Sequence, residues 1–201
     1  MNNVDPVASP NRNRNRMMLL GIFALFFGSL VVAGLLRFSG WRPEGMKNKG
    51  ELLQPPADLR GMTPKLPDGS TYAWAPINRV WRIAVAPPAD CGAECTRAAE
   101  DIHKVWELLG REATRVDVLW LCASTPCDLP TGAPQLANLR LLQPDADLRA
   151  KLPRVDAVAY SGGRGVPVYV IDPNGFVILR YAAGSDPGGL RYDLAKLLKL
   201  K

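Results

Sequence analysis

The stretch VWRIAVAPPADCGAECTRAAEDIHKVWELLG, residues 80–110, determines which class of fold the chain can adopt. Residues 80–86 are almost continuously apolar and are followed by two prolines, which predicts a largely buried strand. Apolar side chains then recur every three or four residues, so an amphipathic helix is expected over about 92–109. Residues 115–121, RVDVLWL, form a second predicted strand. Strand, helix and strand in this order predict a parallel pair joined by a right-handed crossover.

The remainder of the C-terminal half adds two short helices, a hairpin and a terminal helix. Short helices are expected around residues 135–142 and 147–152. Apolar runs at 168–171 and 176–179 flank the turn sequence Asp-Pro-Asn-Gly, a strong hairpin signal. Regularly spaced leucines at 190–198 predict a terminal amphipathic helix. A βαβ unit, a hairpin and a helix in this order resemble the thioredoxin fold, which belongs to the α/β class.

The N-terminal part contains a predicted membrane anchor. Residues 17–36, MMLLGIFALFFGSLVVAGLL, carry no charge, and at about 1.5 Å per residue they would cross a hydrocarbon core of roughly 30 Å. A cleaved signal peptide is the alternative, but its apolar region is typically only about 7 to 15 residues long. Residues 1–16 are expected to form a basic cytoplasmic tail, because arginines cluster on the cytoplasmic side of spans. Residues 37–65, rich in Pro and Gly, are predicted to be a tether to a thioredoxin-like domain over 66–201.

Charge and cysteine usage narrow the possible partners and the compartment. The 201-residue chain has a net charge of +6, but basic and acidic residues are mixed and no basic run interleaves with aromatics, so nucleic-acid binding is not expected. The membrane lipid is an expected partner. All four cysteines follow the predicted span, which favours an oxidising compartment. For a bacterial chain this predicts a single-pass inner-membrane protein with a periplasmic domain.

Cys91 and Cys95 are the candidate reactive residues. They open the predicted helix, and a helix N-terminus favours the thiolate, the form that attacks disulfides or binds soft metals. Residues at i and i+4 inside a helix have Cβ atoms about 5 to 6 Å apart, whereas a disulfide needs about 3.5 to 4.5 Å. Cys91 is therefore expected before the helix, or at its first position, if the pair closes. Two reduced thiols at this spacing could instead hold Cu(I), with Zn as a competitor. Asp90 is a candidate helix N-cap.

Two motifs together resemble the Sco/SenC family. They are residues 90–96, DCGAECT, after a buried strand, and residues 167–176, PVYVIDPNGF. The resemblance implies a membrane-anchored thioredoxin-like protein that helps to assemble the copper centre of cytochrome c oxidase, with Cys91 and Cys95 as redox pair or copper ligands. It also implies a periplasmic cysteine-containing client, such as an oxidase subunit or its assembly factors. The chain departs from that family at Thr96, where a proline is usual. It also lacks the copper-binding histidine before the hairpin, since its only histidine is His103 on the predicted helix.

Four further residues are candidates for the site. Resemblance to thioredoxin-like proteins implies a cis peptide bond between Val166 and Pro167, with Val166 facing the thiols and binding a partner strand. The alternative is an ordinary proline at the start of a strand. Cys122 and Cys127 follow the second predicted strand. They are expected either to form a local structural disulfide or to exchange with the first pair and resolve it; free thiols and a four-thiolate metal site are further alternatives.

Three functions remain open on the sequence alone. The first is a thiol–disulfide oxidoreductase, in which the Cys91 thiolate attacks a client disulfide and Cys95 resolves the intermediate. The second is a non-enzymatic Cu(I) metallochaperone that uses the same thiols. The third is a redox-inert scaffold with two structural disulfides. A serine hydrolase is disfavoured, because His103 is the only histidine and no nucleophile elbow is visible.

Overall fold

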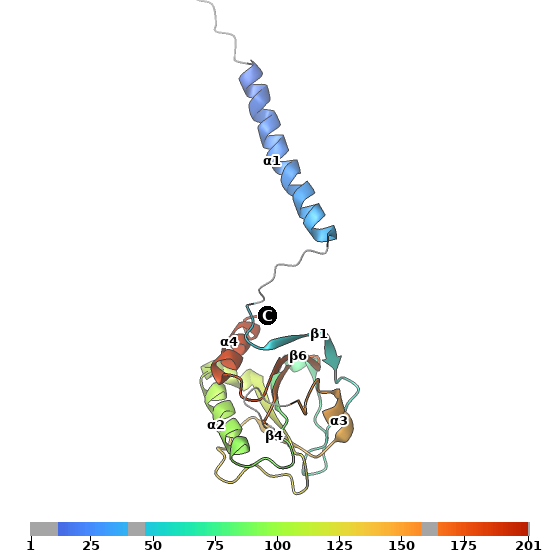
Figure 1. The fold of residues 1–201 in the computed structure, drawn as a ribbon, viewed down its shortest axis with the longest axis vertical. Helices are drawn as coiled ribbons and strands as arrows, with labels where there is room; N and C mark the ends of the chain where they lie inside the picture. Colours follow the sequence, from blue (N-terminus) through green and yellow to red (C-terminus); the bar gives the residue numbers. More distant parts are fainter. Residues whose placement is uncertain (1–11, 40–46, 158–164, 201) are drawn as a thin grey trace, which may run out of the picture. The chain divides into compact units, whose positions relative to one another are not determined.

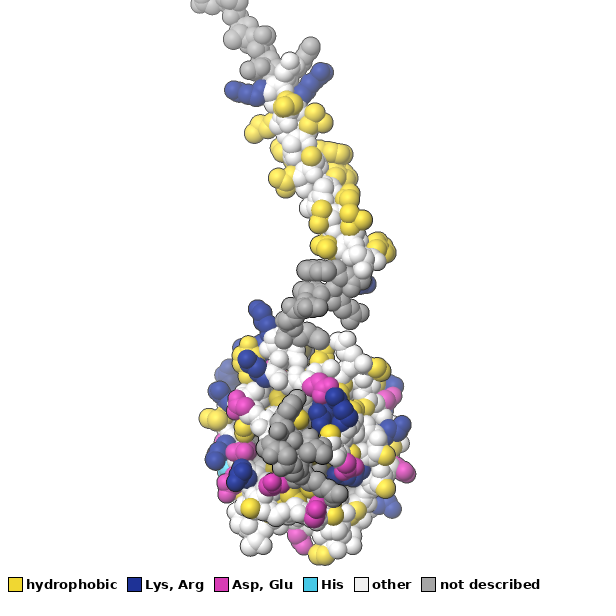
Figure 2. Space-filling view, in the orientation of Figure 1, with side chains coloured by type: hydrophobic (Ala, Val, Ile, Leu, Met, Phe, Trp, Pro, Cys, Tyr) yellow, Lys and Arg dark blue, Asp and Glu magenta, His cyan; other side chains and the backbone are white. Residues whose placement is uncertain are grey.

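A computed structural model describes residues 12–39, 47–157 and 165–200 of the chain. The chain divides into two compact units, Met1–Met46 and Lys47–Lys201. The first unit contains helix α1 (Arg12–Phe38; Figure 1), which exposes apolar side chains along its length (Figure 2). It contains one candidate membrane span, Asn13–Phe38. The predicted apolar helix is therefore confirmed, and it extends beyond the expected span at both ends.

The second unit is built on a six-stranded mixed sheet with the order β1-β6-β5-β2-β3-β4. β2, β3 and β4 run parallel to one another, while β5, β6 and β1 pair in antiparallel fashion on the other side of β2. The strands are β1 (Glu51–Asp58), β2 (Trp81–Val85), β3 (Val116–Leu121), β4 (Leu139–Leu142), β5 (Val168–Ile171) and β6 (Phe176–Tyr181).

Helices cover both faces of this sheet (Figure 1). The remaining elements are α2 (Ala93–Glu107), α3 (Ala146–Lys151), α4 (Pro187–Leu197) and the 3-10 helices η1 (Pro76–Asn78) and η2 (Gly110–Arg115). The apolar sides of α2 and α4 pack on one face of the sheet, where Ile102 and Leu194 join a cluster with Ile83. α3 and the loop before β2 pack on the other face. The predicted β2-α2-β3 unit, hairpin and terminal helix are all present.

One predicted boundary and one predicted helix are wrong. Strand β1 lies inside 37–65, the range expected to be a tether, and the folded unit begins at Lys47 instead of residue 66. β1 contains two prolines, but it is an edge strand whose pairing with β6 shifts register across them, so no central ladder bond is lost. The helix expected over 135–142 is also absent, and β4 forms there instead. Its short apolar run is of a kind that periodicity alone cannot assign to strand or helix.

Asp193 holds the start of the folded unit against α4. Its carboxylate oxygen Oδ2 accepts hydrogen bonds from the backbone N–H groups of Lys49, at 2.7 Å, and Gly50, at 2.9 Å. The same oxygen accepts the hydroxyl of Tyr181 at 2.6 Å. A Cβ at Gly50 would lie 2.5 Å from the ring of Tyr181, so only glycine fits there without displacing the ring. Residues inside the predicted tether are thus part of the packed domain.

Arg82 is a buried charge in the middle of the sheet. It is 1 % exposed, and its guanidinium donates to the carbonyl oxygens of Trp74, Asp172, at 3.1 Å, and Pro173, at 3.0 Å. Its Nε also donates to the hydroxyl of Tyr72 at 2.9 Å. A buried charge is tolerated only when its donors are satisfied in this way. Arg82 therefore ties the loop before β2 and the β5–β6 turn to one side of the sheet.

The environment of Tyr72 predicts that the folded domain loses stability at alkaline pH. Burial, together with the Asp117 carboxylate that accepts its hydroxyl at 2.8 Å, raises the pKa of Tyr72 to about 12. In the unfolded chain a tyrosine has a pKa near about 10, so between these pH values the folded state holds a proton that the unfolded state has lost. Stability from this group is complete below about pH 10 and falls by up to about 1.4 kcal/mol per pH unit above it. Urea unfolding of the full chain in detergent from pH 8 to 11 should show a shallower decline for Tyr72→Phe; parallel declines would contradict this assignment.

Candidate functional site: two disulfides at one end of the sheet

Cys91 and Cys95 form a disulfide at the N-terminus of α2. The S–S bond is 2.03 Å long and joins Cα atoms 5.6 Å apart. Cys91 lies in the loop between β2 and α2, whereas Cys95 lies in the first turn of the helix. Cys91 is thus outside the helix, as the geometric argument for a closed pair requires. The expected N-cap at Asp90 is wrong, since Gly92 occupies that position and has no side chain with which to cap the helix.

The two cysteines differ in exposure. Cys95 is 5 % exposed and belongs to the apolar cluster between the sheet and α2. Cys91 is half-buried and packs against the edge of that cluster. Of the two residues, Cys91 is therefore the one that a partner can approach.

A second disulfide lies at the same end of the sheet. Cys122 and Cys127 are joined by a bond of 1.98 Å, with their Cα atoms 5.4 Å apart. Val85 pairs with Trp120 in the parallel ladder of β2 and β3, so both strands end at this edge, and Cys122 directly follows β3. Cys122 is 8 % exposed and belongs to the same apolar cluster as Cys95. The structure thus brings both predicted pairs to the carboxyl ends of two neighbouring strands, where open α/β sheets place their sites.

Val166 also lies in this region, but its peptide bond differs from the expectation. Val166 is buried in the cluster that contains Cys95. Among the described residues, cis bonds precede Pro55 and Pro126, and the bond before Pro167 is not one of them. The predicted cis bond is therefore wrong. The Pro167 carbonyl accepts the N–H of Ala86 at 3.1 Å, which continues the pairing of β5 with β2 beyond the two strands.

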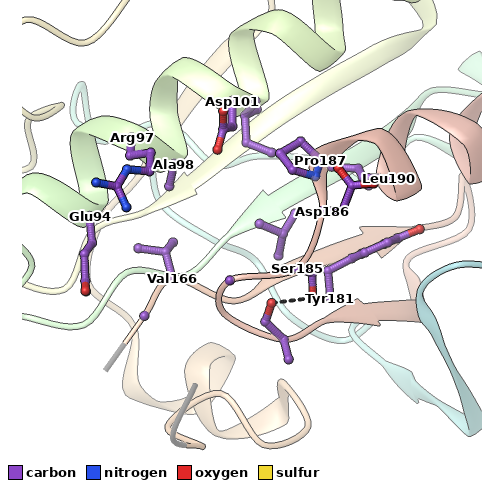
Figure 3. A pocket seen from close by; sticks show the side chains of 15 residues that line it. Glu94, Arg97, Ala98, Asp101, Val166, Tyr181, Ser185, Asp186, Pro187 and Leu190 are labelled. Atoms are coloured by element: carbon purple, nitrogen blue, oxygen red, sulfur yellow. Dashed lines mark hydrogen bonds between the residues drawn. The ribbon is translucent and has the colours of Figure 1, made fainter. Parts of the chain in front are cut away.

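A pocket of about 160 Å³ opens between α2 and the start of α4 (Figure 3). Apolar and charged side chains share its lining. The apolar ones include Ala98, Ile102, Val166, Val168 and Leu190, and the charged ones among the described residues are Glu94, Arg97, Asp101 and Asp186. Sequence reasoning did not identify this pocket, because its two walls are about ninety residues apart in the chain. The one available signal was Asp186 followed by Pro187, a typical start of a helix, which marks the N-terminus of α4.

The donor atoms near the thiols do not make a three-ligand copper site. Within residues 12–39, 47–157 and 165–200, no group of three His, Cys, Asp or Glu residues could hold a metal ion. His103 contacts Glu107, with Nε2 3.3 Å from the carboxylate. It stands eight residues after Cys95, about 12 Å along the helix axis. The undescribed residues 158–164 contain no histidine or cysteine. The pair therefore offers two sulfurs alone, which do not fit a Cys-Cys-His centre.

Comparison with known proteins agrees with this architecture. BsSco, a member of the Sco family of cytochrome c oxidase assembly proteins, is 15% identical and has a TM-score of 0.53 over 76% of this chain and 98% of its own. A SCO1/SenC family lipoprotein from Bacillus anthracis str. Ames is 17% identical, with a TM-score of 0.54 over 73% of this chain and 99% of its own. A putative protein disulfide isomerase from Bacteroides thetaiotaomicron is 18% identical, with a TM-score of 0.51 over 75% and 89%. At these identities the likeness establishes the fold.

The sequence itself also matches one known family. No curated protein sequence is significantly similar to this chain. A family model described as transmembrane-like, thioredoxin-like, C-terminal domain matches residues 81–201, more than half of the chain. The expected resemblance to Sco/SenC proteins is confirmed in the fold that the two share. The chain therefore belongs to this transmembrane-like, thioredoxin-like family, with the fold of the Sco/SenC proteins and an apolar N-terminal helix that is a candidate membrane anchor.

Proposed function

We propose that this protein is a membrane-anchored thiol–disulfide exchange protein that acts through Cys91 and Cys95. The observation that carries the proposal is the closed disulfide at the N-terminus of α2, with Cys91 half-buried and Cys95 almost fully buried. A pair that exchanges disulfides needs one sulfur that a client can reach and a second, less exposed sulfur that resolves the mixed disulfide. Cys122 and Cys127 differ in exposure in the same way, so it is the position at a helix N-terminus, which the first pair has, that favours exchange at Cys91 and Cys95.

The exchange follows from these positions. In the reduced form, the Cys91 thiolate attacks a client disulfide, and one client sulfur leaves as a thiolate. Cys95 then attacks Sγ of Cys91, the mixed disulfide breaks, and the second client thiolate departs. The client gains two electrons and the Cys91–Cys95 pair loses two. A dithiol reductant, itself oxidised to a disulfide, returns the pair to its reduced form.

Helix α2 assists this chemistry at its N-terminus. The N–H groups of the first turn carry a partial positive charge that favours a nearby thiolate. Gly92 at the N-cap places no side-chain acceptor on these groups. The sulfur of Cys91 or Cys95 can therefore interact with the positive end of the helix as each becomes the thiolate in turn.

We further propose that the domain lies on the periplasmic side of an inner membrane. The arginines before the apolar helix favour a cytoplasmic N-terminus, and both cysteine pairs are oxidised, as is common in that compartment. The cysteines of a cytochrome c oxidase subunit are the first client to test. BsSco, which shares the fold, belongs to a family of assembly proteins for that oxidase.

The second disulfide is assigned a structural role in this proposal. Cys122 and Cys127 close a loop of six residues after β3, and a cross-link over so short a loop stabilises a domain by about 2 kcal/mol in the chain-entropy model. Cys122 is 8 % exposed. Cys127 is half-buried, as Cys91 is, but this pair follows a strand and does not lie at a helix N-terminus. The bond keeps the end of β3 in place beside the first pair.

Trapping of a client tests the proposal directly. The variant Cys95→Ser cannot resolve the intermediate, so the reduced full chain in detergent is expected to accumulate a mixed disulfide through Cys91 with a disulfide-containing peptide. Intact-mass spectrometry gives the adduct, and peptide mapping gives its position. Cys91→Ser is the matched control and should form no adduct through Cys95. Equal adducts on both variants, or none on either, contradict the assigned order of attack. Stoichiometric Cu(I) uptake without any adduct would support a metallochaperone instead.

A further inference from the structure

The pocket between α2 and α4 shares the first turns of α2 with the Cys91–Cys95 site, although neither cysteine is among its described lining residues. Glu94 and Ala98 line it and lie on either side of Cys95 along the helix. Ile102 and Val166, two more lining residues, belong to the same apolar cluster as Cys95. A polypeptide joined to Cys91 through its own cysteine would therefore have this pocket within reach of its neighbouring residues. We call this pocket the α2–α4 groove, and its lining includes Glu94, Arg97, Ala98, Asp101, Ile102, Val166, Val168, Asp186 and Leu190.

The length of the groove sets how much of a client it can hold. Glu94 and Asp101, its two acidic lining residues on α2, are seven residues apart, so they are separated by about 10 Å along the helix axis. An extended chain advances about 3.3 Å per residue, which gives room for about three residues beside the client cysteine. The floor is apolar, with Ala98, Val166 and Leu190 among its residues. It suits an apolar side chain better than a polar one.

The rim of the groove is acidic, although the chain as a whole is basic. Among the described lining residues, Glu94, Asp101 and Asp186 contribute carboxylates, and Arg97 is the one basic side chain (Figure 3). Asp186 already accepts the N–H of Gly188 at 2.9 Å. In the part of the chain that the structure describes, neither Glu94 nor Asp101 takes part in an ion pair or side-chain hydrogen bond. Their charges are thus available to a bound cation.

We propose that the α2–α4 groove binds the segment next to the client's reactive cysteine and selects segments in which an apolar residue and a Lys or Arg lie within about three residues of that cysteine. The apolar side chain packs on the floor, and the cation lies against Glu94 and Asp101. This inference rests on the proposed exchange function and adds the class of client sequence. Charge complementarity at such a rim acts mainly on specificity and on the rate of encounter.

Two peptide substrates test the inference. In each, the single cysteine is held in a disulfide with the same small thiol, and the two peptides differ in one residue. Both carry the same apolar residue, and one has Lys where the other has Glu, three residues from the cysteine. With the reduced full chain in detergent at low ionic strength, the Lys peptide is expected to exchange about tenfold faster, since two partly exposed charge contacts change from repulsion to attraction. The ratio of the Lys-peptide rate to the Glu-peptide rate should fall towards one in about 1 M salt, where the Debye length is about 3 Å.

Variants of α2 locate the effect. The double substitution Glu94→Gln and Asp101→Asn is expected to reduce the Lys-to-Glu ratio to about twofold. Glu100→Gln, on the same helix but outside the groove, should leave the ratio unchanged. Equal rates for the two peptides, or a ratio that survives the double substitution, would overturn the inference while leaving the exchange function intact. Failure of both peptides and of the neutral hydroxyethyl disulfide to react would instead reject the proposed function.

Discussion

Replacing Cys91 with serine is expected to reduce disulfide exchange by the full-length protein to the rate of the reductant alone. Cys91 is the more exposed member of its pair, so its loss removes the sulfur that meets the client. Cys95 remains, but it is 5 % exposed and cannot replace Cys91. The measurement is the reduction of a fluorescent peptide disulfide by dithiothreitol, with the full chain in detergent at catalytic concentration.

The second disulfide supplies the control for this experiment. The double variant Cys122→Ser and Cys127→Ser loses about 2 kcal/mol of stability but keeps the Cys91–Cys95 pair, so below its melting temperature it should retain most of the exchange rate. The reverse pattern, with activity lost in this variant and kept in Cys91→Ser, would transfer the redox role to the second pair. A loss in both variants, with the fold intact, would show that the two pairs work in series.

Substituting Arg82 with methionine is expected to give the largest loss of stability. Methionine keeps much of the apolar stem but removes the donors that reach the Trp74, Asp172 and Pro173 carbonyl oxygens. Each buried group left without a partner costs about 1 to 3 kcal/mol, so the total loss should be about 3 to 5 kcal/mol. For a domain of this size that corresponds to a fall in Tm of about 10 °C. Differential scanning calorimetry of the full chain in detergent measures it.

An exposed arginine is the matched control for Arg82. The Arg111 side chain is 95% exposed and lies 3.7 Å from Glu112 in a surface ion pair. Such pairs contribute little, so Arg111→Met should change the stability by less than about 1 kcal/mol. If Arg82→Met changed the stability as little, the carbonyl groups around Arg82 would have found other partners. Arg82 would then not be what ties the loop before β2 and the β5–β6 turn to the sheet.

The centre of the fold was predictable because its signals are local. The continuous apolar run of β2, the helical period of α2 and the turn between β5 and β6 each lie within about fifteen residues. β1 was missed because Pro55 and Pro56 read as strand breakers, and only its pairing at the edge with β6 makes them tolerable. That pairing joins residues more than a hundred positions apart, which no local pattern can reveal. β4 was missed because its four residues, Leu139–Leu142, are too few to show whether their apolar pattern has the period of a helix or of a strand.

The candidate site, like the fold, was predictable where its residues are set by local sequence. Cys91 and Cys95 were identified because a strand, a short loop and a helix start fix their surroundings within the local sequence. The α2–α4 groove was missed because it forms only when the start of α4 packs beside α2. Val166 belongs to the same apolar cluster as Cys95, but the cis bond expected before Pro167 is wrong, since that expectation came from resemblance instead of from this chain's own residues.

The reduction potential of the Cys91–Cys95 bond tests the central claim most directly. The full chain in detergent is equilibrated with a series of thiol–disulfide buffers, free thiols are alkylated, and mass spectrometry follows the Cys91 and Cys122 peptides separately. A redox-active pair predicts a potential between about −120 and −270 mV for Cys91–Cys95, while a structural Cys122–Cys127 bond should lie below about −300 mV. A potential below about −300 mV for both bonds would make Cys91–Cys95 a structural staple and contradict the account.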